Sequence, residues 1–346
     1  MSKNMKVGLI GTGMVSGTYV DAIANTVGRI DLASVAASSL ASAEAFVAKH
    51  GLSAEPKDFG SMAEDGSLDF VIVTTPPNAR LEIVSAFAET RIPILMEKPV
   101  ERTLAAARQL VSKCEDAGVP LGIMFQHRAR PSAQAMRDLL HERDAGPLRA
   151  VEISVPWWRE QAYYDEPGRG TYERDGGGVL ISQAIHTLDL ALTFTGEVEH
   201  VHAMSAKTGF HKMEAEDFVS AGIRLKDGAV GSLFASTASH PGRAEEIILH
   251  YANMSVRLQS NMLEVVDQVT GETETIGASA ATGAGADPMA FTSDWHRLMI
   301  ENFADHLDHG TPLFAPGRSA LAVHELIAAI ELSGRENRMV RLSEVT

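Results

Sequence analysis

Short apolar runs alternate with amphipathic segments over the first third of the chain. The apolar runs predict buried strands over residues 5–10, 30–36, 68–74, 92–96 and 120–125. Between them, residues that return to one face every three or four positions predict helices over 14–27, 41–50 and 103–117, with another ending near 90. Regular alternation of strand and helix is typical of a doubly wound parallel sheet, so we predict one α/β domain over residues 1–125.

The pattern changes after residue 125. A helix is expected over 132–142, a strand over 149–156, a polar aromatic loop over 157–175 and a helix over 179–194. From residue 198, alternating segments flank turn signals at 226–228, 253–254 and 270–271, which predicts three hairpins in succession. Helices over 294–308 and 319–333 follow. Residues 126–346 are therefore expected to form an α+β domain with an open, mainly antiparallel sheet.

A glycine-rich turn joins the first predicted strand to the first helix. Gly11 permits a tight turn and Gly13 lets the backbone approach a pyrophosphate at the helix N-terminus, while Ser16 supplies a third small residue. The strand–turn–helix context favours dinucleotide binding. The residues expected to contact the dinucleotide lie in this turn and at the ends of the following strands: Gly11, Thr12, Gly13, Met14, Val15, Ser38, Ser39, Thr75, Pro76, Asn78, Glu97, Lys98 and Gln126.

The end of the second predicted strand bears on which nicotinamide dinucleotide binds. Such folds usually place an acid there to bind the ribose hydroxyls, whereas this chain has Ser38 and Ser39. Without a carboxylate a ribose phosphate is not repelled, but no arginine or lysine occurs between Arg29 and Lys49 to bind one. NAD and NADP both stay open, with NAD favoured.

Composition and charge narrow the class of protein. The 346 residues are 45% hydrophobic and 22% charged, which is ordinary for a globular chain of two domains. A formal net charge of -15 argues against nucleic acid or an anionic membrane as the main partner. No apolar run is long enough for a membrane span, and glycines interrupt the stretch after Lys3 and Lys6, so no signal peptide is expected. Cys114 is the only cysteine, which fits a reducing compartment, and we expect a cytoplasmic location.

Lys98 follows the strand predicted over residues 92–96, in the run Glu97-Lys98-Pro99. Ligands of open parallel sheets bind beyond the carboxyl ends of the strands, where a lysine can reach a substrate hydroxyl and take its proton. Glu97 would hold the lysine, and Pro99 would turn the chain. Alone, this run is better explained as a surface ion pair. The motifs before and after it favour a catalytic lysine.

His186 lies on the helix that follows Gly176-Gly177-Gly178, with Asp189 close behind it. A neutral imidazole can take the proton of a hydroxyl as hydride leaves the same carbon. A lone histidine on an apolar helix is more often structural. Three consecutive glycines let backbone or ligand pass close by, and this favours a functional histidine.

The polar aromatic loop is the second source of ligand-binding side chains. Aromatic faces stack on sugar rings, while arginine and aspartate hydrogen-bond vicinal hydroxyls. A loop packed on its own aromatics explains single residues equally well, but the block favours a pocket for a polyhydroxylated substrate. Its residues expected to contact substrate are Trp158, Arg159, Tyr163, Arg169 and Asp175.

Two other kinds of site are not expected. No pair of histidines or cysteines stands at ligand spacing on one face with an acid partner, so no metal is predicted. No Gly-x-Ser-x-Gly elbow occurs, so a serine nucleophile is not predicted either.

Together the motifs resemble the glucose–fructose oxidoreductase, inositol dehydrogenase and rhizopine-catabolism (Gfo/Idh/MocA) family over nearly the full chain. The motifs that carry the resemblance are Gly11-Thr12-Gly13, Thr75-Pro76-Pro77-Asn78, Glu97-Lys98-Pro99, Arg128, Gly176-Gly177-Gly178 with His186, and Glu216-Asp217. The resemblance implies an N-terminal Rossmann domain and a C-terminal domain whose open sheet makes an oligomer interface, so we expect a homo-oligomer, a dimer or tetramer.

The resemblance also implies hydride transfer at a carbinol carbon of a sugar, cyclitol or related polyol, with Lys98 and His186 in the active site. It adds Arg128 and Ser182 to the expected substrate-binding residues. Ser182 is a departure, since the family usually has Asp or Asn four residues before the histidine. The proton relay is therefore expected to run through Lys98 and His186 only. Arg80 stands where many members have a histidine, which bears on how the cofactor is held.

Three functions are weighed. An NAD(P)-dependent sugar or polyol dehydrogenase is favoured. A glycosidase that oxidises, eliminates and re-reduces with a bound nicotinamide would retain its cofactor through purification and reduce no added NAD. Lys98 and His186 argue against a non-catalytic nucleotide sensor. This alternative stays open because Ser182 replaces the acid or amide that the family usually has.

Overall fold

The computed structural model describes residues 4–281, 283–285, 287 and 289–345, and the chain forms two compact units. The first contains Met1–Glu101, Ala105–Gln126 and Ser293–Leu321. The second contains Arg102–Leu104, His127–Thr292 and Ala322–Thr346. This division differs from the expected boundary at residue 125, because residues 293–321 and Gln126 belong to the first unit and Arg102–Leu104 belong to the second.

The first unit is built on a six-stranded sheet in the order β3-β2-β1-β4-β5-β6, in which all neighbouring strands are parallel. Its strands are β1 (Met5–Ile10), β2 (Ile30–Ala36), β3 (Glu55–Lys57), β4 (Phe70–Val73), β5 (Ile94–Met96) and β6 (Leu121–Ile123). The order reverses between β1 and β4, so the predicted doubly wound fold is confirmed. The edge strand β3 was not predicted, because Glu-Pro-Lys has no apolar run.

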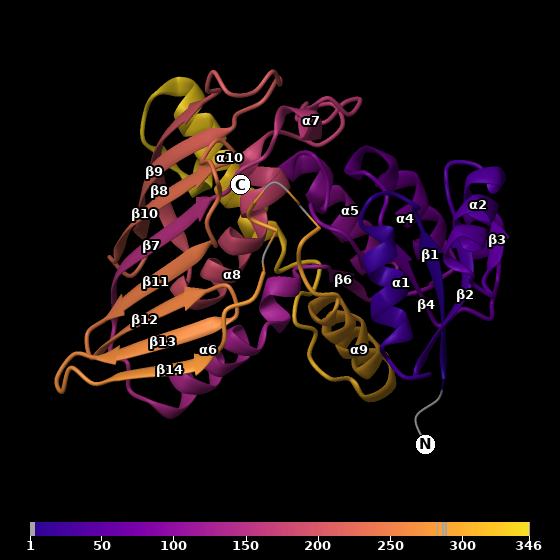
Figure 1. Ribbon diagram of the computed structural model, residues 1–346, viewed down its shortest axis with the longest axis horizontal. Coiled ribbons are helices and arrows are strands. Elements are labelled where there is room, and N and C mark those ends of the chain that lie inside the picture. Colours follow the sequence, from indigo (N-terminus) through magenta and orange to yellow (C-terminus); the bar gives the residue numbers. More distant parts are fainter. Residues whose placement is uncertain (1–3, 282, 286, 288, 346) are drawn as a thin grey trace. The chain divides into compact units, whose positions relative to one another are not determined.

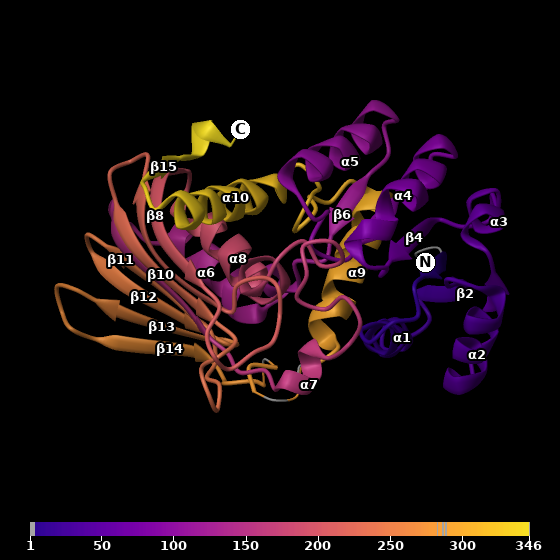
Figure 2. The same cartoon turned by 90° about the horizontal axis from the view of Figure 1, so that it is seen from above.

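Helices fill the crossovers of this sheet (Figures 1 and 2). They are α1 (Ser16–Ala24), α2 (Leu40–His50), α3 (Phe59–Ala63), α4 (Arg80–Glu89) and α5 (Leu104–Asp116), with a 3₁₀ turn at Pro77–Ala79 before α4. The short helix α3 was also not predicted. Asn78 lies inside the 3₁₀ turn, and α4 begins after Ala79 without a side-chain cap.

Helix α9 (Asp294–His309) belongs to the first unit and packs beside α1. Its Phe303 ring lies 5.3 Å from the ring of Phe70 on β4. A Cβ at Gly122 would come within 2.9 Å of the Phe303 ring, so the strand glycine makes room for it. The chain then extends β6, since Ile123 N–H donates to Ala315 O and Gly317 N–H donates to Leu121 O.

The second unit is built on a nine-stranded sheet in the order β14-β13-β12-β11-β7-β10-β9-β8-β15. Its strands are β7 (Leu148–Pro156), β8 (Val198–Ala206), β9 (Phe218–Leu225), β10 (Val230–Ser236), β11 (Glu246–Tyr251), β12 (Met254–Gln259), β13 (Met262–Asp267), β14 (Thr273–Gly277) and β15 (Val340–Arg341). The three expected hairpins, β9/β10, β11/β12 and β13/β14, are confirmed.

The hairpins were expected to follow one another directly in the sheet, and this expectation is wrong between β10 and β11. Strand β7 lies between β10 and β11, parallel to the first and antiparallel to the second. Because β7 comes much earlier in the chain, no local pattern marks this position.

Helices α6 (Pro131–Glu142), α8 (Ile185–Thr195) and α10 (Leu321–Glu336) lie on one side of the nine-stranded sheet, as Figure 2 shows. Shorter helical turns are α7 (Gln161–Tyr164), a π-helical turn at Leu180–Ala184, and 3₁₀ turns at Gln126–Ala129 and Leu342–Glu344. Buried and exposed residues alternate along β9, so one face packs on the core and the other is polar.

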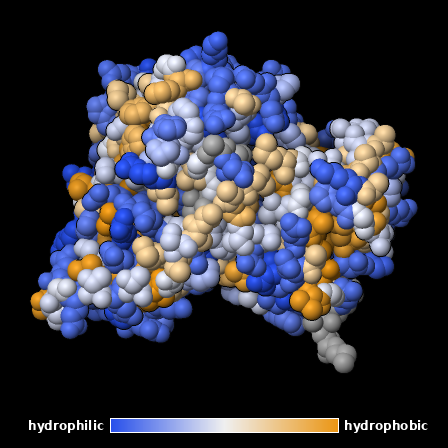
Figure 3. Space-filling view, in the orientation of Figure 1, coloured by the Kyte–Doolittle hydropathy of each residue, from blue (hydrophilic) through white to orange (hydrophobic). Residues whose placement is uncertain are grey.

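Hydrophilic side chains predominate on the face drawn in Figure 3, and strongly hydrophobic residues gather there only in small groups. This fits the net charge of -15. Within the described residues, no helix combines the length and apolar character needed to cross a membrane.

We predict that Phe303→Ala lowers the free energy of unfolding by about 3–5 kcal/mol, since it leaves a cavity between α9 and the parallel sheet. Urea titration followed by far-ultraviolet circular dichroism measures this. Asp308→Ala, an exposed position on the same helix, is the control and should change little. Equal stabilities for the two variants would mean that α9 is not an integral part of the first unit.

Candidate active site

The glycine turn after β1 has the conformation that the sequence predicted. Gly11 has φ +109°, and a Cβ there would lie 2.6 Å from Thr74 Oγ1 and 2.9 Å from Thr75 N. Only glycine fits, because both the backbone angle and the close approach exclude a side chain. A Cβ at Gly13 would meet nothing within 4 Å, so protein packing does not demand this glycine. The space beside it is open to a ligand.

The remaining expected dinucleotide contacts also lie in the first unit. Met14 is about half exposed, and Ser38 and Ser39 are exposed beyond β2. Ser39 caps α2, since its hydroxyl accepts the N–H of Ser42. A helix-capping role for Ser39 was not part of the sequence prediction.

Three polar residues stand at the carboxyl ends of neighbouring parallel strands: Thr75 after β4, Lys98 after β5 and Gln126 after β6. Thr75 Oγ1 and Gln126 Oε1 are buried, and neither atom has a hydrogen-bond partner within the described residues. Buried polar atoms are nearly always satisfied, so these two call for a ligand or water. Together with the open space at Gly13, they fit a dinucleotide along this edge of the sheet.

Glu97 fixes the backbone of Lys98. The Glu97 carboxylate is buried, and it accepts hydrogen bonds from the Tyr19 hydroxyl at 2.8 Å and from the Lys98 N–H at 3.0 Å. The ring of His296, on α9, meets the Tyr19 ring edge-on at 5.2 Å. Burial, with a smaller contribution from the positive charge of Lys98, lowers the pKa of His296 to about 3. His296 is therefore uncharged at neutral pH.

Arg80 hydrogen-bonds the backbone carbonyls on both sides of Lys98. Its buried guanidinium donates to Thr75 O at 2.9 and 2.8 Å, to Glu97 O at 2.5 Å and to Pro99 O. Burial lowers the pKa of Arg80 to about 10, which leaves it charged at neutral pH. Arg80 thus fixes the backbone on both sides of Lys98. Tyr19 and His296 were not predicted as site residues, because their partners are distant in sequence. Arg80 was expected to bear on how the cofactor is held, but its contacts with backbone carbonyls were not predicted.

In the second unit, Glu216 fixes the start of the helical segment that carries His186. Its carboxylate accepts the N–H groups of Gly178 and Leu180, each at 3.1 Å, and its carbonyl accepts the N–H of Val179 at 2.9 Å. A Cβ at Gly178 would lie 1.8 Å from Glu216 O, so only glycine permits this contact. This close approach explains the third glycine of the run and the acid of Glu216-Asp217.

His186 lies on α8, two residues after the π-helical turn Leu180–Ala184, and is 6% exposed. Its ring stacks on that of His127, with centroids 4.9 Å apart and planes at 29°. A π-turn inside a helix is frequently found at functional sites. Ser182 lies within this turn and is half-buried.

Asp189 lies on α8 near His186 but pairs with Arg128. The two form a buried bidentate ion pair, from Arg128 Nε and Nη2 to the carboxylate, at 2.7 and 2.5 Å. Burial raises the pKa of Asp189, and the charge of Arg128 opposes this. Arg128, an expected substrate contact, thus has two of its donors bound to Asp189.

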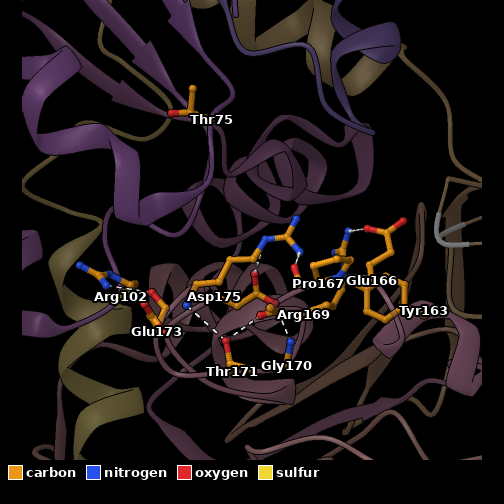
Figure 4. A network of polar contacts seen from close by, with 12 residues as sticks. Thr75, Arg102, Tyr163, Glu166, Pro167, Arg169, Gly170, Thr171, Glu173 and Asp175 are labelled. Atoms are coloured by element: carbon orange, nitrogen blue, oxygen red, sulfur yellow. Dashed lines mark hydrogen bonds and ion pairs between the residues drawn. The ribbon is translucent and has the colours of Figure 1, made fainter. Parts of the chain in front are cut away.

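The polar aromatic loop is held by its own hydrogen bonds (Figure 4). Arg169 donates to the Tyr163 hydroxyl at 2.9 Å and to Glu166 at 3.0 Å, and Asp175 accepts the N–H of Gly170 at 2.8 Å. The Tyr163 hydroxyl also accepts from Gln183 Nε2 at 3.2 Å, which brings the loop to the π-helical turn. Tyr163 and Arg169 are therefore brought together near the segment that leads to His186.

Trp158 and Arg159 are more enclosed than the sequence prediction implied. Arg159 is 3% exposed, and its Nη1 donates to Trp158 O at 2.8 Å and to Gly285 O at 2.7 Å. Trp158 packs against the rings of Phe210, His211 and His240.

His211 links this loop to Asp217. Its ring nitrogens contact Asp217 Oδ2 at 2.7 Å and Arg159 O at 2.8 Å. It was not predicted, because its partners are separated from it along the chain.

A second carboxyl lies beside the glycine run. Glu331, on α10, has its Oε1 atom 3.3 Å from the position of a Cβ at Gly177, and this atom has no hydrogen-bond partner in the described ranges. Burial raises the pKa of Glu331 to about 8, with a further contribution from the charge of Glu216. No cluster of three or more His, Cys, Asp or Glu side chains that could hold a metal occurs among residues whose positions are described.

The expected dinucleotide contacts all lie in the first unit, and the expected substrate contacts other than Lys98 lie in the second. Two sequence models of one family match these parts of the chain. Residues 5–125 match an oxidoreductase family with an NAD-binding Rossmann fold, GFO_IDH_MocA, and residues 133–257 match the GFO/IDH/MocA C-terminal domain.

Characterised relatives cover nearly the whole chain. D-apiose dehydrogenase of Paraburkholderia graminis is 27% identical over 363 residues, which span 99% of this chain and 91% of the relative. D-glucoside 3-dehydrogenase of Escherichia coli is 26% identical over 356 residues, spanning 99% and 98%. Among solved structures, the WlbA dehydrogenase from Bordetella pertussis, in complex with NADH and UDP-GlcNAcA, superposes with a TM-score of 0.82 at 25% identity, covering 98% and 99% of the two chains.

We predict that Glu331→Gln stabilises the protein increasingly as pH rises from about 4.5 to about 8. The folded state keeps Glu331 protonated in this window, whereas the unfolded chain releases the proton, so wild-type stability falls with pH. The variant lacks this loss. Its advantage should reach about 2 kcal/mol at pH 9, less than the full pKa shift implies because the carboxyl is partly exposed.

Urea unfolding of both proteins at pH 5, 7 and 9 measures the difference. Glu336→Gln, an exposed position on the same helix, is the control. A pH-independent difference for Glu331→Gln would contradict the assigned ionisation.

Proposed function

Because the chain belongs to the GFO/IDH/MocA family of oxidoreductases, with its NAD-binding Rossmann fold, we propose that it is a dehydrogenase of sugars, cyclitols or related polyols. The reaction moves a hydride between NAD and a carbinol carbon of the substrate. The observation that carries the proposal is the row of Thr75, Lys98 and Gln126 at neighbouring strand ends, with two orphaned buried oxygen atoms. The named relatives, which act on D-apiose and on D-glucosides, support the substrate class.

NAD supplies the hydride acceptor when it is bound. The turn at Gly11–Val15 would hold the pyrophosphate, because its backbone N–H groups lie at the start of α1 and Gly13 leaves the approach open. Thr75 and Gln126 offer their free oxygen atoms to donors of the dinucleotide. Ser38 and Ser39, exposed after β2, would meet the adenosine ribose without a charge of either sign and would give the phosphate of NADP no cationic partner.

Lys98 takes the proton of the substrate hydroxyl as the hydride leaves. A proton acceptor must be held still to act efficiently, and the backbone of Lys98 is fixed by Glu97 on one side and Arg80 on the other. The nearby His296 is uncharged and adds no second cation.

His186 assists with the same proton and orients the hydroxyl. It is buried on a helix whose start is clamped by Glu216, so its position depends little on side-chain flexibility. Tyr163, Arg169 and Ser182 supply hydrogen-bonding groups suited to neighbouring hydroxyls of a polyol. Assembly through the open sheet and a cytoplasmic location stay predictions.

The test of the function is the rate of nicotinamide reduction with NAD and with NADP across a panel of aldoses, inositols, glucosides and sugar acids. NAD-dependent turnover on one class of the panel is the expected result. If no member is oxidised while the purified protein retains a nicotinamide, the redox-assisted glycosidase becomes the better description.

We predict that Lys98→Met lowers turnover by about 10²–10⁴-fold, since it removes the proton acceptor while keeping the length of the side chain. The dissociation constant for NAD, measured by calorimetry, should change only a few-fold. Lys49→Met, at an exposed position of α2, is the matched control with unchanged turnover. Turnover of Lys98→Met at the wild-type rate would remove Lys98 from the mechanism.

We predict that His186→Asn lowers kcat/KM by about 10²-fold and removes the ionisation of an imidazole from the acid limb of the pH–rate profile. Asparagine keeps a hydrogen-bonding group but does not titrate. Steady-state kinetics between pH 5 and 9 measures both effects. If the profile keeps its wild-type shape, His186 does not carry the proton.

A further inference from the structure

The imidazole that stacks on His186 belongs to a buried network of hydrogen bonds that has no role in the proposed reaction as described above. His127 is 3% exposed, and its Nε2 atom lies 2.5 Å from Arg130 Nη2. Arg130 is 2% exposed and donates through Nη1 to Glu245 at 2.6 Å and to Ser260 O at 3.2 Å. Glu245 in turn accepts from Trp157 Nε1 at 3.3 Å.

The hydrogen bond between Arg130 and His127 fixes the protonation state of His127. A guanidinium has five donors and no acceptor, so His127 Nε2 must accept the hydrogen bond with its lone pair. A proton on that atom would break the bond and place a second cation beside Arg130. Arg130 itself stays charged because its partner Glu245, only 3% exposed, balances it.

The charges around the stacked pair come from several elements. Arg130, which precedes α6, contacts His127, and Arg137 on α6 donates to Arg128 O at 3.2 Å. On α8, Asp189 binds Arg128, and Glu245 approaches from the segment before β11. Each of the two carboxylates has an arginine partner, so neither offers an unbalanced negative charge to His127.

We propose that His127 is a positioning residue for His186: Arg130 holds its imidazole uncharged, so the stacked pair carries at most one proton and that proton lies on His186. The stack orients the His186 ring, and a neutral neighbour does not repel the imidazolium that forms on proton transfer. The catalytic consequence rests on the proposed function, but the protonation state of His127 does not.

Nuclear magnetic resonance of the full-length protein labelled with ¹⁵N-histidine tests the protonation state directly. The His127 signals, assigned by their loss in His127→Gln, should show an unprotonated Nε2 throughout pH 5–9. In Arg130→Met/Glu245→Gln, which removes both charges and keeps an acceptor for Trp157, His127 should titrate with a midpoint near the ordinary imidazole value, about 6.5. Arg143→Met/Glu274→Gln, an exposed ion pair of the same unit, should leave His127 unchanged.

The pH dependence of kcat/KM tests the catalytic consequence. The double variant should acquire a second ionisation on its acid limb, near pH 6.5. Adding His127→Gln should abolish that second ionisation, because the amide oxygen cannot take the proton. A merely structural role for Arg130 predicts that the triple variant keeps the altered profile or simply loses activity at every pH.

The outcomes separate the two proposals. Titration of His127 in the wild-type protein, or no titration in the double variant, overturns the inference whether or not the protein oxidises a polyol. Absence of turnover on every polyol, with His127 unprotonated at Nε2 as described, leaves the inference standing and counts against the proposed function.

Discussion

A buried guanidinium holds together the strand ends on which the N-terminal part of the candidate site depends. Arg80 hydrogen-bonds backbone carbonyls that follow β4 and β5, so one planar group fixes two neighbouring ends of the sheet. The cost of burying a cation is offset because carbonyl oxygens replace its water shell and Glu97 stands nearby as a counter-charge. Lys98 lies between the residues that Arg80 holds, and its backbone is therefore fixed before any ligand arrives.

In the second unit a buried carboxylate, and not a guanidinium, fixes the backbone that leads to a candidate site residue. Glu216 binds the N–H groups of Gly178 and Leu180, where a helical segment begins and its unsatisfied donors favour an anion. Burial raises the pKa of Glu216, and these backbone hydrogen bonds oppose that shift. The glycine is what makes the arrangement possible, since any side chain at 178 would occupy the space of the Glu216 carbonyl. In both units a buried charge solvated by backbone positions the segment that carries a functional side chain.

Much of the fold was predictable from local sequence patterns. Apolar runs located the strands of the parallel sheet, turn residues located three hairpins, and the motifs around Gly11, Lys98 and His186 stand where the sequence placed them along these elements. Local pattern failed wherever a partner is distant in the chain. The position of β7 between β10 and β11, and the packing of α9 on the parallel sheet, depend on long-range contacts that leave no periodic signal.

The roles of single charged residues were harder to predict for the same reason. Asp189 stands three residues after His186, and its partner, Arg128, lies 61 residues away. Arg80 binds carbonyl oxygens, which every residue possesses, so its sequence context carries no sign of the contact.

Neither Ser182 nor Asp189 presents an unpaired negative charge to His186. Ser182 offers a hydroxyl, which hydrogen-bonds but carries no charge, at the position where a carboxylate would stabilise an imidazolium. Asp189 is close along the helix, but its charge is balanced by the bidentate contact with Arg128. An imidazolium at His186 therefore gains less from these two residues than it would from an unpaired carboxylate. A general base works best when its pKa lies near the operating pH, and a neighbouring carboxylate would raise that pKa, so the serine is compatible with the proton transfer that we propose for His186.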